Sequence, residues 1–363
     1  MKTKLGLYSS ALCLLLLVGC GNGDKTPVAT LYGSTTINEA IDIKYSEFSS
    51  MMDDKMSFIL TQYPENHCYC WSSFRDNVLY PYIEASHLIT YQIGFSAFNV
   101  QGRNQYGIDA REDRPSVYII EDGVVKYSAM YSGDSQIFHD YNAFKGWIEE
   151  FVYKPNVFYV TESELENLFK GTDNFIIYYS WSVCPDCSYL QKNHLEEYFR
   201  DIKAEYPTIY AIDCYQEGIM LNKNGEYDRA LYETFIAKYN LSAETNSRYG
   251  YRTGVVPTLQ YVEPNGTFNP NESIKSSYVY VNDVITFSNN KYIVTESFFS
   301  QERLQYLPYL NNVENNVIQG ITLTADEVNV GANNENIKWK YEKSAQWYNP
   351  LFDAFMNYYK NKI

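Results

Sequence analysis

One sequence pattern occurs twice in this chain of 363 residues, and it constrains the fold more than any other feature. In each copy, a short amphipathic segment and an apolar, strand-like run precede two closely spaced cysteines. The runs and their cysteines are residues 58–60 with Cys68 and Cys70, and residues 175–177 with Cys184 and Cys187. Internal similarity of this kind predicts two units of one fold.

A proline and a turn signal complete each copy. They are Pro115 with Asp122-Gly123, and Pro257 with Asn265-Gly266. Asp-Gly and Asn-Gly favour tight hairpins because both central positions of such a turn need positive φ. Each copy is therefore expected to end in a hairpin that a proline introduces.

The length of the chain also favours two domains, because domains typically hold about 100 to 150 residues. We place the first unit at residues 38–154 and the second at residues 155–363, with Lys154-Pro155 at the joint. An amphipathic helix is expected at the end of each unit.

The second unit is longer than the first, and we place its extra residues in two insertions, near 215–248 and 268–344. Leu231, Phe235 and Tyr239 fall at helical spacing, which predicts a helix in the first insertion. The second insertion has no assigned purpose, and a small third domain or a partner-binding face are alternative interpretations of it.

Composition excludes two classes of protein. The 37 Tyr and 19 Phe residues exclude a disordered chain, because disordered chains lack aromatic residues. The 44 acidic and 29 basic residues give a formal charge of -15, and an anionic surface repels phosphate backbones. We therefore expect no nucleic acid among the partners.

The N-terminus has the pattern of an export signal. Lys2 and Lys4 precede an apolar stretch from residue 5 to residue 18 that is too short for a comfortable membrane span. The four residues Leu17-Val18-Gly19-Cys20 then resemble the bacterial lipobox, whose cysteine carries lipid after cleavage. A plain secretory signal that ends elsewhere and an uncleaved anchor are the alternatives.

The lipobox reading sets the expected location of the protein. It implies a signal peptide at residues 1–19, a tether at residues 20–37 and a lipid on Cys20. The chain would then be anchored at the extracytoplasmic face of a bacterial cell membrane. This compartment permits disulfides.

The motif Cys184-Pro185-Asp186-Cys187, together with Pro257 before a hairpin, resembles the thioredoxin-like superfamily. The resemblance implies an α/β protein with two tandem thioredoxin-like domains, each a central mixed sheet flanked by helices. A C-x-x-C alone is also half of a zinc site, but the other candidate ligands, His67, Cys68 and Cys70, lie in the other unit. We expect neither a metal nor a cofactor.

The chemistry is assigned first to Cys184 and Cys187. A helix is expected from Pro185 to about residue 203, and Pro185 suits its first position because a missing N–H costs nothing there. Cys184 would then lie at the positive end of the helix, which stabilises the thiolate that attacks disulfides. Cys187 would be the resolving thiol, and a plain structural disulfide is the alternative.

The resemblance also assigns roles around the cysteines. Pro257 would be the cis-proline beside the motif, and the Val256 backbone would receive the substrate strand by edge pairing. An ordinary trans proline that begins a strand is the alternative. Trp181 is similar to the aromatic lid of the family, although in this aromatic-rich chain it is equally a core residue.

The direction of electron transfer stays open in the sequence. Cytoplasmic thioredoxins carry a buried aspartate six residues before the nucleophile, and this chain has Tyr178 there. Asp186 should raise the pKa of Cys184, which favours a reductase or an isomerase. Val256 favours the opposite direction, because exported oxidants of this fold often carry Val at that position.

Three further cysteines have less certain roles. A Cys68–Cys70 disulfide would be strained and reducible, so this pair is either a second redox site or part of a degenerate copy that is kept for docking. Pro115 holds the place of the cis-proline in the first unit. Cys214 is interpreted as a small buried hydrophobe, with trapping of a neighbouring thiol as the alternative.

Two functions follow from these assignments. The first is a membrane-anchored thiol–disulfide oxidoreductase, whose partners would be the thiols and disulfides of exported proteins and an unidentified redox partner. The second is a non-catalytic binding lipoprotein that uses the tandem fold as a scaffold. The intact motif beside Pro257 favours the enzyme, because a scaffold has no need of it.

Overall fold

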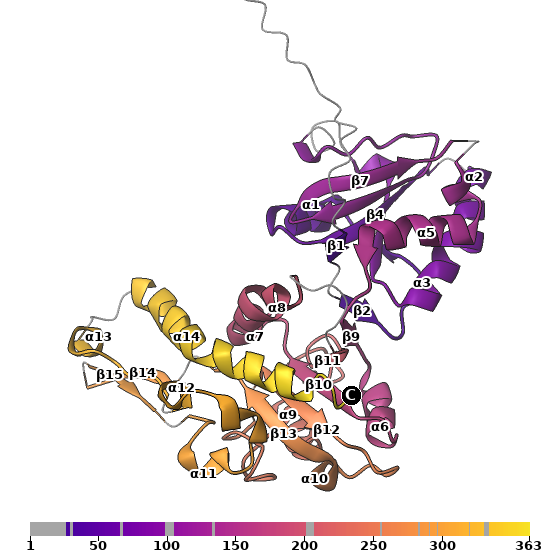
Figure 1. The fold of residues 1–363 in the computed structure, drawn as a ribbon. Helices are drawn as coiled ribbons and strands as arrows, with labels where there is room; N and C mark the ends of the chain where they lie inside the picture. Colours follow the sequence, from indigo (N-terminus) through magenta and orange to yellow (C-terminus); the bar gives the residue numbers. More distant parts are fainter. Residues whose placement is uncertain are drawn as a thin grey trace, which may run out of the picture.

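The structure of the protein is a computed structural model (Figure 1). The described residues are 27–29, 32–65, 68–98, 105–132, 135–200, 207–254, 256–281, 284–289, 291–295, 297–318, 320–329 and 334–363. The predicted signal peptide, Cys20 and His67 lie outside the described residues.

The first unit is built on a five-stranded sheet with the order β3-β5-β4-β6-β7. β3, β5 and β4 are mutually parallel, β6 runs antiparallel to β4, and β7 runs antiparallel to β6. The strands are β3 (Ile41–Asp42), β4 (Phe58–Tyr63), β5 (Thr90–Gly94), β6 (Ser116–Glu121) and β7 (Val124–Met130). Asp122 and Gly123 join β6 to β7 with φ of 52° and 72°, which confirms the predicted hairpin.

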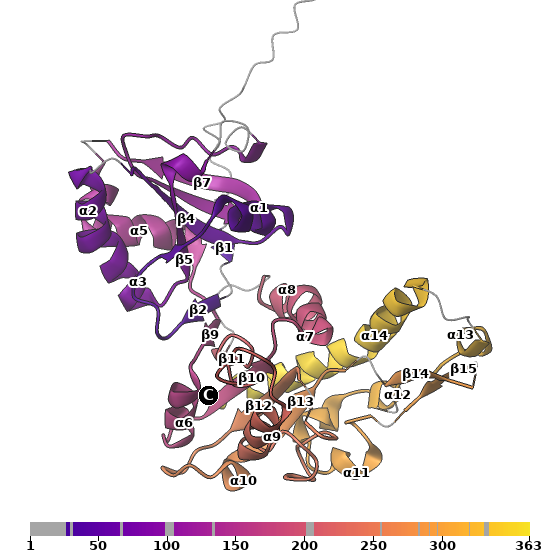
Figure 2. The ribbon, with the colours of Figure 1, turned by 180° about the vertical axis from the view of Figure 1, so that it is seen from behind.

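Helices cover both faces of this sheet (Figures 1 and 2). They are α1 (Tyr45–Asp53), α2 (Tyr69–Phe74), α3 (Tyr80–Ser86) and α5 (Tyr141–Phe151), with the π-helical turn η1 (Arg75–Leu79) and the 3-10 turns η2 (Phe95–Ala97) and η3 (Gln136–Phe138). Phe48 of α1 packs with Phe58 on one face. Phe74 of α2 and Phe144 of α5 pack over Ile59 on the other.

The second unit has a six-stranded sheet with the order β13-β12-β10-β11-β9-β2. Its strands are β2 (Tyr32–Ser34), β9 (Val157–Tyr159), β10 (Phe175–Ser180), β11 (Ile209–Asp213), β12 (Thr258–Val262) and β13 (Ile274–Val279). β2, β9, β11 and β10 are parallel, β12 runs antiparallel to β10, and β13 runs antiparallel to β12. Without β2, the order and directions repeat those of the first sheet.

The helices of the second unit also lie on both faces of its sheet. They are α6 (Glu162–Phe169), α7 (Pro185–Leu190), the π-helical turn η4 (Gln191–Leu195), α8 (Glu196–Arg200), α9 (Arg229–Lys238), α10 (Pro270–Ser273) and α14 (Asn334–Tyr359). Leu190 of α7 and Phe352 of α14 pack on the same face as Ile176. Leu165 of α6 and Phe235 of α9 pack on the opposite face with Ile177.

The shared topology fixes the fold class. Counted along each unit, the strands lie in the order 1-3-2-4-5, with strands 1 to 3 parallel, strand 4 antiparallel to strand 2, and strand 5 antiparallel to strand 4. In both units the helix that follows strand 2 begins beside a cysteine. The protein is therefore an α/β protein with two tandem thioredoxin-like domains.

The segment predicted as a tether at residues 20–37 contains ordered strands, so that prediction is wrong for its C-terminal part. β1 (Val28–Ala29) pairs with β8 (Val152–Tyr153) at the end of the first unit, and β2 adds to the edge of the second sheet. The residues before the first unit thus complete the sheet of the second. An exposed edge is covered in this way.

The insertion predicted at residues 268–344 also needs correction. β13 lies inside this range but is the fifth strand of the sheet, and an eleven-residue connection with α10 replaces the tight hairpin predicted at Asn265-Gly266. The inserted part therefore begins after Val279. It holds the hairpin β14 (Ile285–Ser288) and β15 (Lys291–Val294), followed by α11 (Gln301–Leu304), η5 (Pro308–Asn312), α12 (Asn315–Ile318) and α13 (Ala325–Asn329).

The closing helix α14 begins at Asn334, inside the range predicted as an insertion. Aromatic residues hold it against the sheet. Tyr359 stacks on Tyr261 of β12 with ring centroids 4.1 Å apart, and Phe352 meets Tyr278 of β13 at 5.4 Å. Both contacts are buried, so α14 is part of the core of the second unit.

Candidate active site

Cys184 is the N-cap residue of α7. Its backbone is extended, with φ of -85° and ψ of 123°, and its carbonyl accepts the first helical bond from the Ser188 N–H at 3.0 Å. Pro185 occupies the first helical position, where its missing N–H removes no bond. The side chain of Cys184 thus lies where unpaired N–H groups and the helix dipole favour negative charge.

The environment of Cys184 lowers its pKa to about 7. The largest cause is a hydrogen bond from the Cys187 thiol, and the backbone N–H groups of Cys187 and Asp186 act in the same direction. Burial and the Asp186 carboxylate raise the pKa. The predicted effect of Asp186 thus has the expected sign, but the hydrogen bonds outweigh it.

Cys187 lies one turn further along α7 and is buried, with 2% of its surface exposed. Its sulfur accepts a hydrogen bond from the Trp181 N–H at 3.3 Å. The pKa of the Cys187 thiol is raised well above its usual value. Burial is the largest cause, and the Cys184 sulfur is the next. At neutral pH the two cysteines therefore differ: Cys184 is partly thiolate and accessible, and Cys187 is a protonated, buried thiol.

Pro257 lies beside this pair, at the start of β12. The Val256–Pro257 peptide bond is cis, and the Cys184 thiol donates to the Val256 carbonyl with an S–O distance of 3.8 Å. The Pro257 carbonyl accepts from the Tyr280 N–H. The structure thus brings together Cys184, Cys187, Val256 and Pro257, which lie 73 residues apart at their extremes in the sequence.

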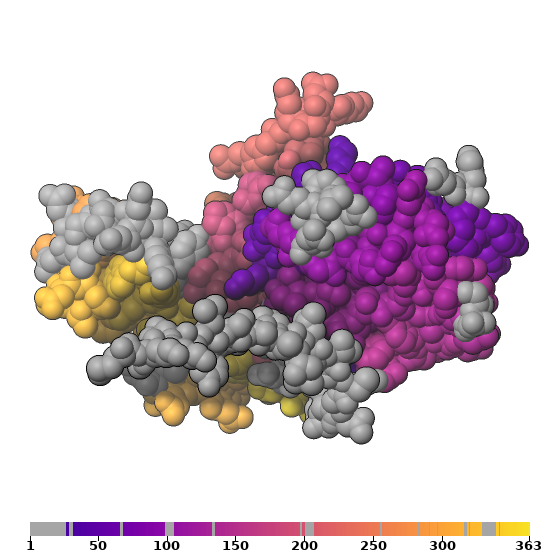
Figure 3. Space-filling model, turned by 90° about the horizontal axis from the view of Figure 1, so that it is seen from above, coloured from indigo at the N-terminus to yellow at the C-terminus, as the bar shows by residue number. Residues whose placement is uncertain are grey.

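Trp181 forms an aromatic group with two residues of the first insertion. Its ring stacks on that of Tyr227 at 6.3 Å, with 13° between the planes, and meets Tyr232 of α9 at 6.4 Å. Trp181 is half-buried and Tyr227 is exposed. Figure 3 shows part of the segment before α9, coloured salmon, projecting from the body of the molecule.

Sequence reasoning missed Tyr227 and Tyr232. The predicted face of α9 included Leu231, which is 42% exposed, whereas Phe235 and Tyr239 are buried as expected. The helical period places Tyr232 on the same side as Phe235 and Tyr239, and that signal was available in the sequence.

Two other residues near the pair are buried. Tyr178 lies on β10 below α7, and burial raises the pKa of its phenol well above the usual value. Cys214 follows β11 and donates its N–H to the Ser180 carbonyl at 2.9 Å. Burial also raises the pKa of Cys214, so at neutral pH it is a protonated thiol in the apolar core.

The first unit has a related arrangement with different chemistry. Cys68 is the N-cap of α2 and forms a disulfide with Cys70, their Cα atoms 5.1 Å apart. Trp71 stands at the position, three residues after the N-cap, that Cys187 occupies in the second unit. Cys68 borders a cavity of about 480 Å³ that is also lined by Tyr63, Tyr69, Trp71 and Arg75.

Pro115 occupies the same place as Pro257 but differs in geometry. Its carbonyl accepts from the N–H of Tyr131, the residue after β7, as the carbonyl of Pro257 accepts from the N–H of Tyr280, the residue after β13. Among the described residues, however, only Val256–Pro257 is cis. The assignment of Pro115 to a cis-proline place is therefore wrong for the isomer, because the surrounding chain decides which isomer a proline adopts.

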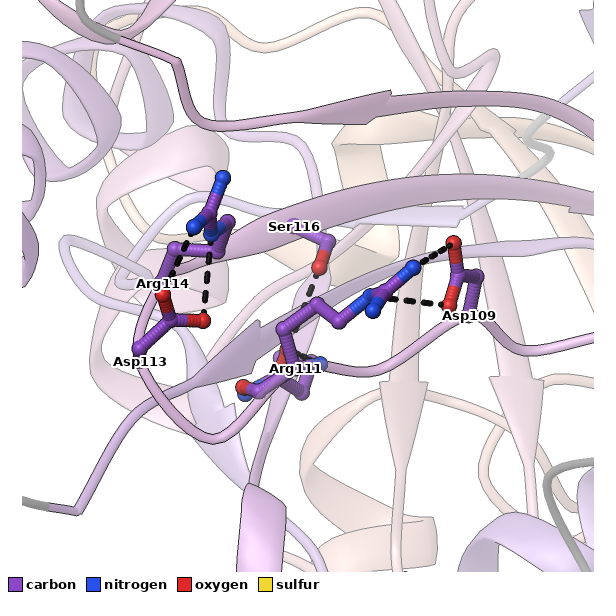
Figure 4. A network of polar contacts seen from close by, with 6 residues as sticks. Asp109, Arg111, Asp113, Arg114 and Ser116 are labelled. Atoms are coloured by element: carbon purple, nitrogen blue, oxygen red, sulfur yellow. Dashed lines mark hydrogen bonds and ion pairs between the residues drawn. The ribbon is translucent and has the colours of Figure 1, made fainter.

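Polar contacts surround Pro115 on both sides in the sequence (Figure 4). Arg111 pairs with Asp109 at 3.1 Å and Arg114 with Asp113 at 2.6 Å, while the Ser116 hydroxyl donates to a side-chain oxygen of Gln62 at 3.1 Å. The two ion pairs are exposed and contribute little stability. The buried Ser116 contact sets the start of β6.

The site of the second unit predicts a specific pH profile. Because only the thiolate reacts, alkylation of Cys184 by iodoacetamide should rise about tenfold per pH unit below the pKa and level off about one unit above it, with half-maximal rate near pH 7. Cys187 and Cys214 should stay unreacted over this range. Mass spectrometry of the tryptic peptide 171–192 measures both cysteines of the pair, and a midpoint near 9 would show that the site does not activate Cys184.

These observations define the class of protein: two tandem thioredoxin-like domains, of which the second carries a dithiol at a helix N-terminus beside a cis-proline. No protein-family model and no curated protein matches the chain. Within the described residues, no helix combines the length and apolar character needed to cross a bilayer, and no group of three or more His, Cys, Asp or Glu side chains could hold a metal ion.

Several solved structures are similar to the chain at low identity. Human ERp44 form I has 10% identity and a TM-score of 0.29, over 63% of this chain and 50% of that one. The first two thioredoxin domains of Eps1p from Naumovozyma dairenensis have 10% identity and a TM-score of 0.23, over 75% of this chain and 97% of theirs. Full-length ERdj5 has 10% identity and a TM-score of 0.23, over 65% of this chain and 29% of that one.

The match covers half of ERp44 and under a third of ERdj5. The fold class of this chain rests on its strand order and on the position of its cysteines, not on these similarities.

Proposed function

We propose that this chain is a thiol–disulfide oxidoreductase that acts through Cys184 and Cys187. One observation carries the proposal: an accessible thiol with a pKa of about 7 lies at the N-terminus of α7, next to a buried thiol whose pKa is raised. A disulfide kept only for stability would gain little here, because the loop between the two cysteines is very short.

The reaction in the reducing direction has two steps. The Cys184 thiolate attacks one sulfur of a substrate disulfide, so a Cys184–substrate bond forms and the other substrate sulfur leaves as a thiolate. Cys187 then loses its proton and attacks Cys184, which forms the Cys184–Cys187 disulfide and releases the second substrate thiolate. The oxidising direction is the reverse, and a redox partner would restore the starting form.

The pKa of Cys184 bears on the direction. A value of about 7 is close to that of thioredoxin and far above the ~3.5 of the strongly oxidising DsbA. A less stabilised thiolate makes the disulfide form less oxidising. This favours a reductase or an isomerase.

We place the reaction at the extracytoplasmic face of a bacterial membrane, with exported proteins as substrates. Support for this comes from the sequence alone, namely the export signal and the lipobox that ends at Cys20. A chain anchored there would meet proteins whose disulfides form after export.

A redox titration tests the proposed activity. The full chain is equilibrated in glutathione or dithiothreitol buffers, free thiols are alkylated, and the oxidised fraction of peptide 171–192 is measured. We expect a reduction potential between about -270 and -180 mV, the range of reductases and isomerases of this fold. A potential well below about -300 mV would identify a structural disulfide and contradict the proposal.

A binding role is a second candidate for the first unit. Trp71 replaces the resolving cysteine there, and Tyr69 is 83% exposed beside the cavity next to Cys68. Exposed aromatic residues around a concave site are typical of protein-binding surfaces. A first unit that only binds would keep this role when Cys68 and Cys70 are both replaced by serine.

A further inference from the structure

The inserted part that follows Val279 contacts the loop that leads to Pro257. We call residues 248–254 the proline loop. Five consecutive residues of this loop touch the inserted part. Arg248 and Tyr249 meet Tyr306, Gly250 meets Arg303, Tyr251 meets Phe298, and Arg252 meets Thr295. These contacts indicate that the inserted part fixes the path of the loop.

Arg303 of α11 holds the backbone of the proline loop. Its Nη1 donates a hydrogen bond to the Gly250 carbonyl, and its guanidinium lies over the Phe298 ring, 5.1 Å from the centroid. Phe298 is fully buried, and its ring meets that of Tyr251 at 6.1 Å with 85° between the planes. A hydrogen bond from a charged donor is stronger than one between neutral groups. Arg303 therefore joins the proline loop firmly to α11.

The backbone of the proline loop has a conformation that its neighbours must impose. Arg252 has a φ of 46°, in the left-handed region that residues with a side chain rarely occupy. A residue stays there only where the surrounding structure determines its backbone. The Nη2 of Arg252 donates to the Thr295 hydroxyl at 3.3 Å, so the inserted part supplies one such determinant. Gly250 passes so close to the Ser242 carbonyl that a Cβ atom would not fit.

The inserted part also contacts the helix that carries the two cysteines. Tyr280 is its first residue, and its side chain is buried. The Tyr280 N–H donates to the Pro257 carbonyl at 3.1 Å, and the Tyr280 ring stacks on that of Tyr189 in α7 at 6.0 Å, with 13° between the planes. Tyr189 lies two residues after Cys187. The inserted part thus touches the proline loop, Pro257 itself and α7.

These contacts bear on the place where a substrate would bind. Val256 lies two residues after the proline loop, and its carbonyl oxygen is 3.8 Å from the Cys184 sulfur. A displacement of about 1 Å between a substrate and a catalytic group lowers a reaction rate substantially. Because an extended polypeptide pairs with backbone groups, a shift of the proline loop would move its disulfide relative to Cys184. A small reagent that needs no such pairing would still react.

We propose that the inserted part fixes the proline loop so that Val256 and Pro257 hold a polypeptide disulfide at Cys184, and that Arg303 is the main positioning residue. The inference rests on the proposed function and gives the inserted part a purpose. It adds no covalent step to the proposed reaction. Arg303 acts on that reaction through the Gly250 carbonyl and the path of the proline loop.

Arg303→Ala tests this role in the full chain with a protein substrate and a small reagent. We expect kcat/KM for the reduction of insulin to fall about tenfold, the equivalent of one hydrogen bond to a charged group, because the Gly250 carbonyl loses its donor. Alkylation of Cys184 by iodoacetamide should stay within about twofold of the wild-type rate and keep its midpoint near pH 7, because α7 and Cys187 set that pKa. Arg303→Lys keeps a charged donor and should restore kcat/KM to within about threefold of the wild type.

Two further variants separate positioning from a loss of folding. Lys343→Ala is the matched control, because Lys343 forms a partly buried ion pair with Glu327 at 2.9 Å that joins α14 to α13 and involves no residue of the proline loop. It should keep the wild-type rate of both reactions. Thr295→Val is a milder change at the loop, since it removes the acceptor of Arg252 and keeps the shape of the side chain. It should lower kcat/KM for insulin about threefold and leave alkylation unchanged.

The outcomes separate this inference from the proposed function. Slower insulin reduction with unchanged alkylation in Arg303→Ala, recovered in Arg303→Lys, supports the inference. Insulin reduction at the wild-type rate in both Arg303→Ala and Thr295→Val overturns the inference alone, and so does an equal loss of both reactions in every loop variant. If the wild-type chain is alkylated at Cys184 but reduces no insulin, the proposed function fails and the inference fails with it.

Discussion

Replacing Cys184 with serine is expected to lower the rate of disulfide reduction by roughly 1,000-fold or more, because a hydroxyl is not ionised at neutral pH and forms no exchangeable bond with sulfur. The structure makes this the largest effect of any single change. Cys184 is the partly exposed thiol at the N-terminus of α7, whereas Cys187 and Cys214 are buried with raised pKa values. Reduction of insulin by the full chain with dithiothreitol measures the rate.

Two matched variants show which sulfur is responsible. Cys214→Ser changes a buried thiol outside the pair and should keep most of the activity. Cys68→Ser with Cys70→Ser removes the disulfide of the first unit and should also keep it if that unit only binds substrate. Activity that survives in Cys184→Ser but disappears when Cys68 and Cys70 are replaced would move the reaction to the first unit.

The parts of the structure that the sequence predicted well depend on local rules. A proline after Cys184 suits the first turn of a helix whatever surrounds it, so the N-cap position of Cys184 follows from adjacent residues. The Asp122-Gly123 turn is similar, because its φ angles are set by the two residues themselves. The doubled pattern then identifies the repeated fold.

The parts that the sequence did not predict depend on contacts between distant residues. β2 is a three-residue strand, too short to carry a pattern, and it forms only because the edge of β9 is open more than 120 residues later. The trans isomer of the Arg114–Pro115 bond could not be predicted either, because contacts with the surrounding chain decide the isomer. The sequence predicts that Asp186 raises the pKa of Cys184. Only the structure shows that hydrogen bonds from Cys187 lower this pKa by more than Asp186 raises it.

The two units divide the features of an oxidoreductase between them. The second holds an accessible and a buried thiol, a cis-proline and an aromatic group from an inserted helix. The first holds a disulfide with no thiol at the resolving position, beside a cavity with an exposed tyrosine. Because β2 adds residues 32–34 to the second sheet, the second unit contains parts of the chain from before and from after the first unit.

Replacing Cys187 with alanine should convert the proposed oxidoreductase into a trap for its substrates. Cys184 would still attack a disulfide, but no thiol would lie within reach to release the product, so mixed disulfides should accumulate. The loss of the Cys187 hydrogen bond, the largest cause that lowers the pKa of Cys184, should also raise that pKa toward its usual value. Trapping should therefore be slow at pH 7 and faster at about pH 8.5, where more of Cys184 is ionised.

The experiment expresses the full chain with Cys187→Ala in a bacterium that exports it and compares non-reducing with reducing gels. Bands that are lost on reduction, and absent when Cys184 is also replaced, identify exported proteins bound through Cys184. Cys214→Ala is the matched control, because it removes a buried thiol from the same cluster without touching the pair. Equal trapping in the control and in Cys187→Ala, or none in either, would contradict the assignment of Cys187 as the resolving thiol.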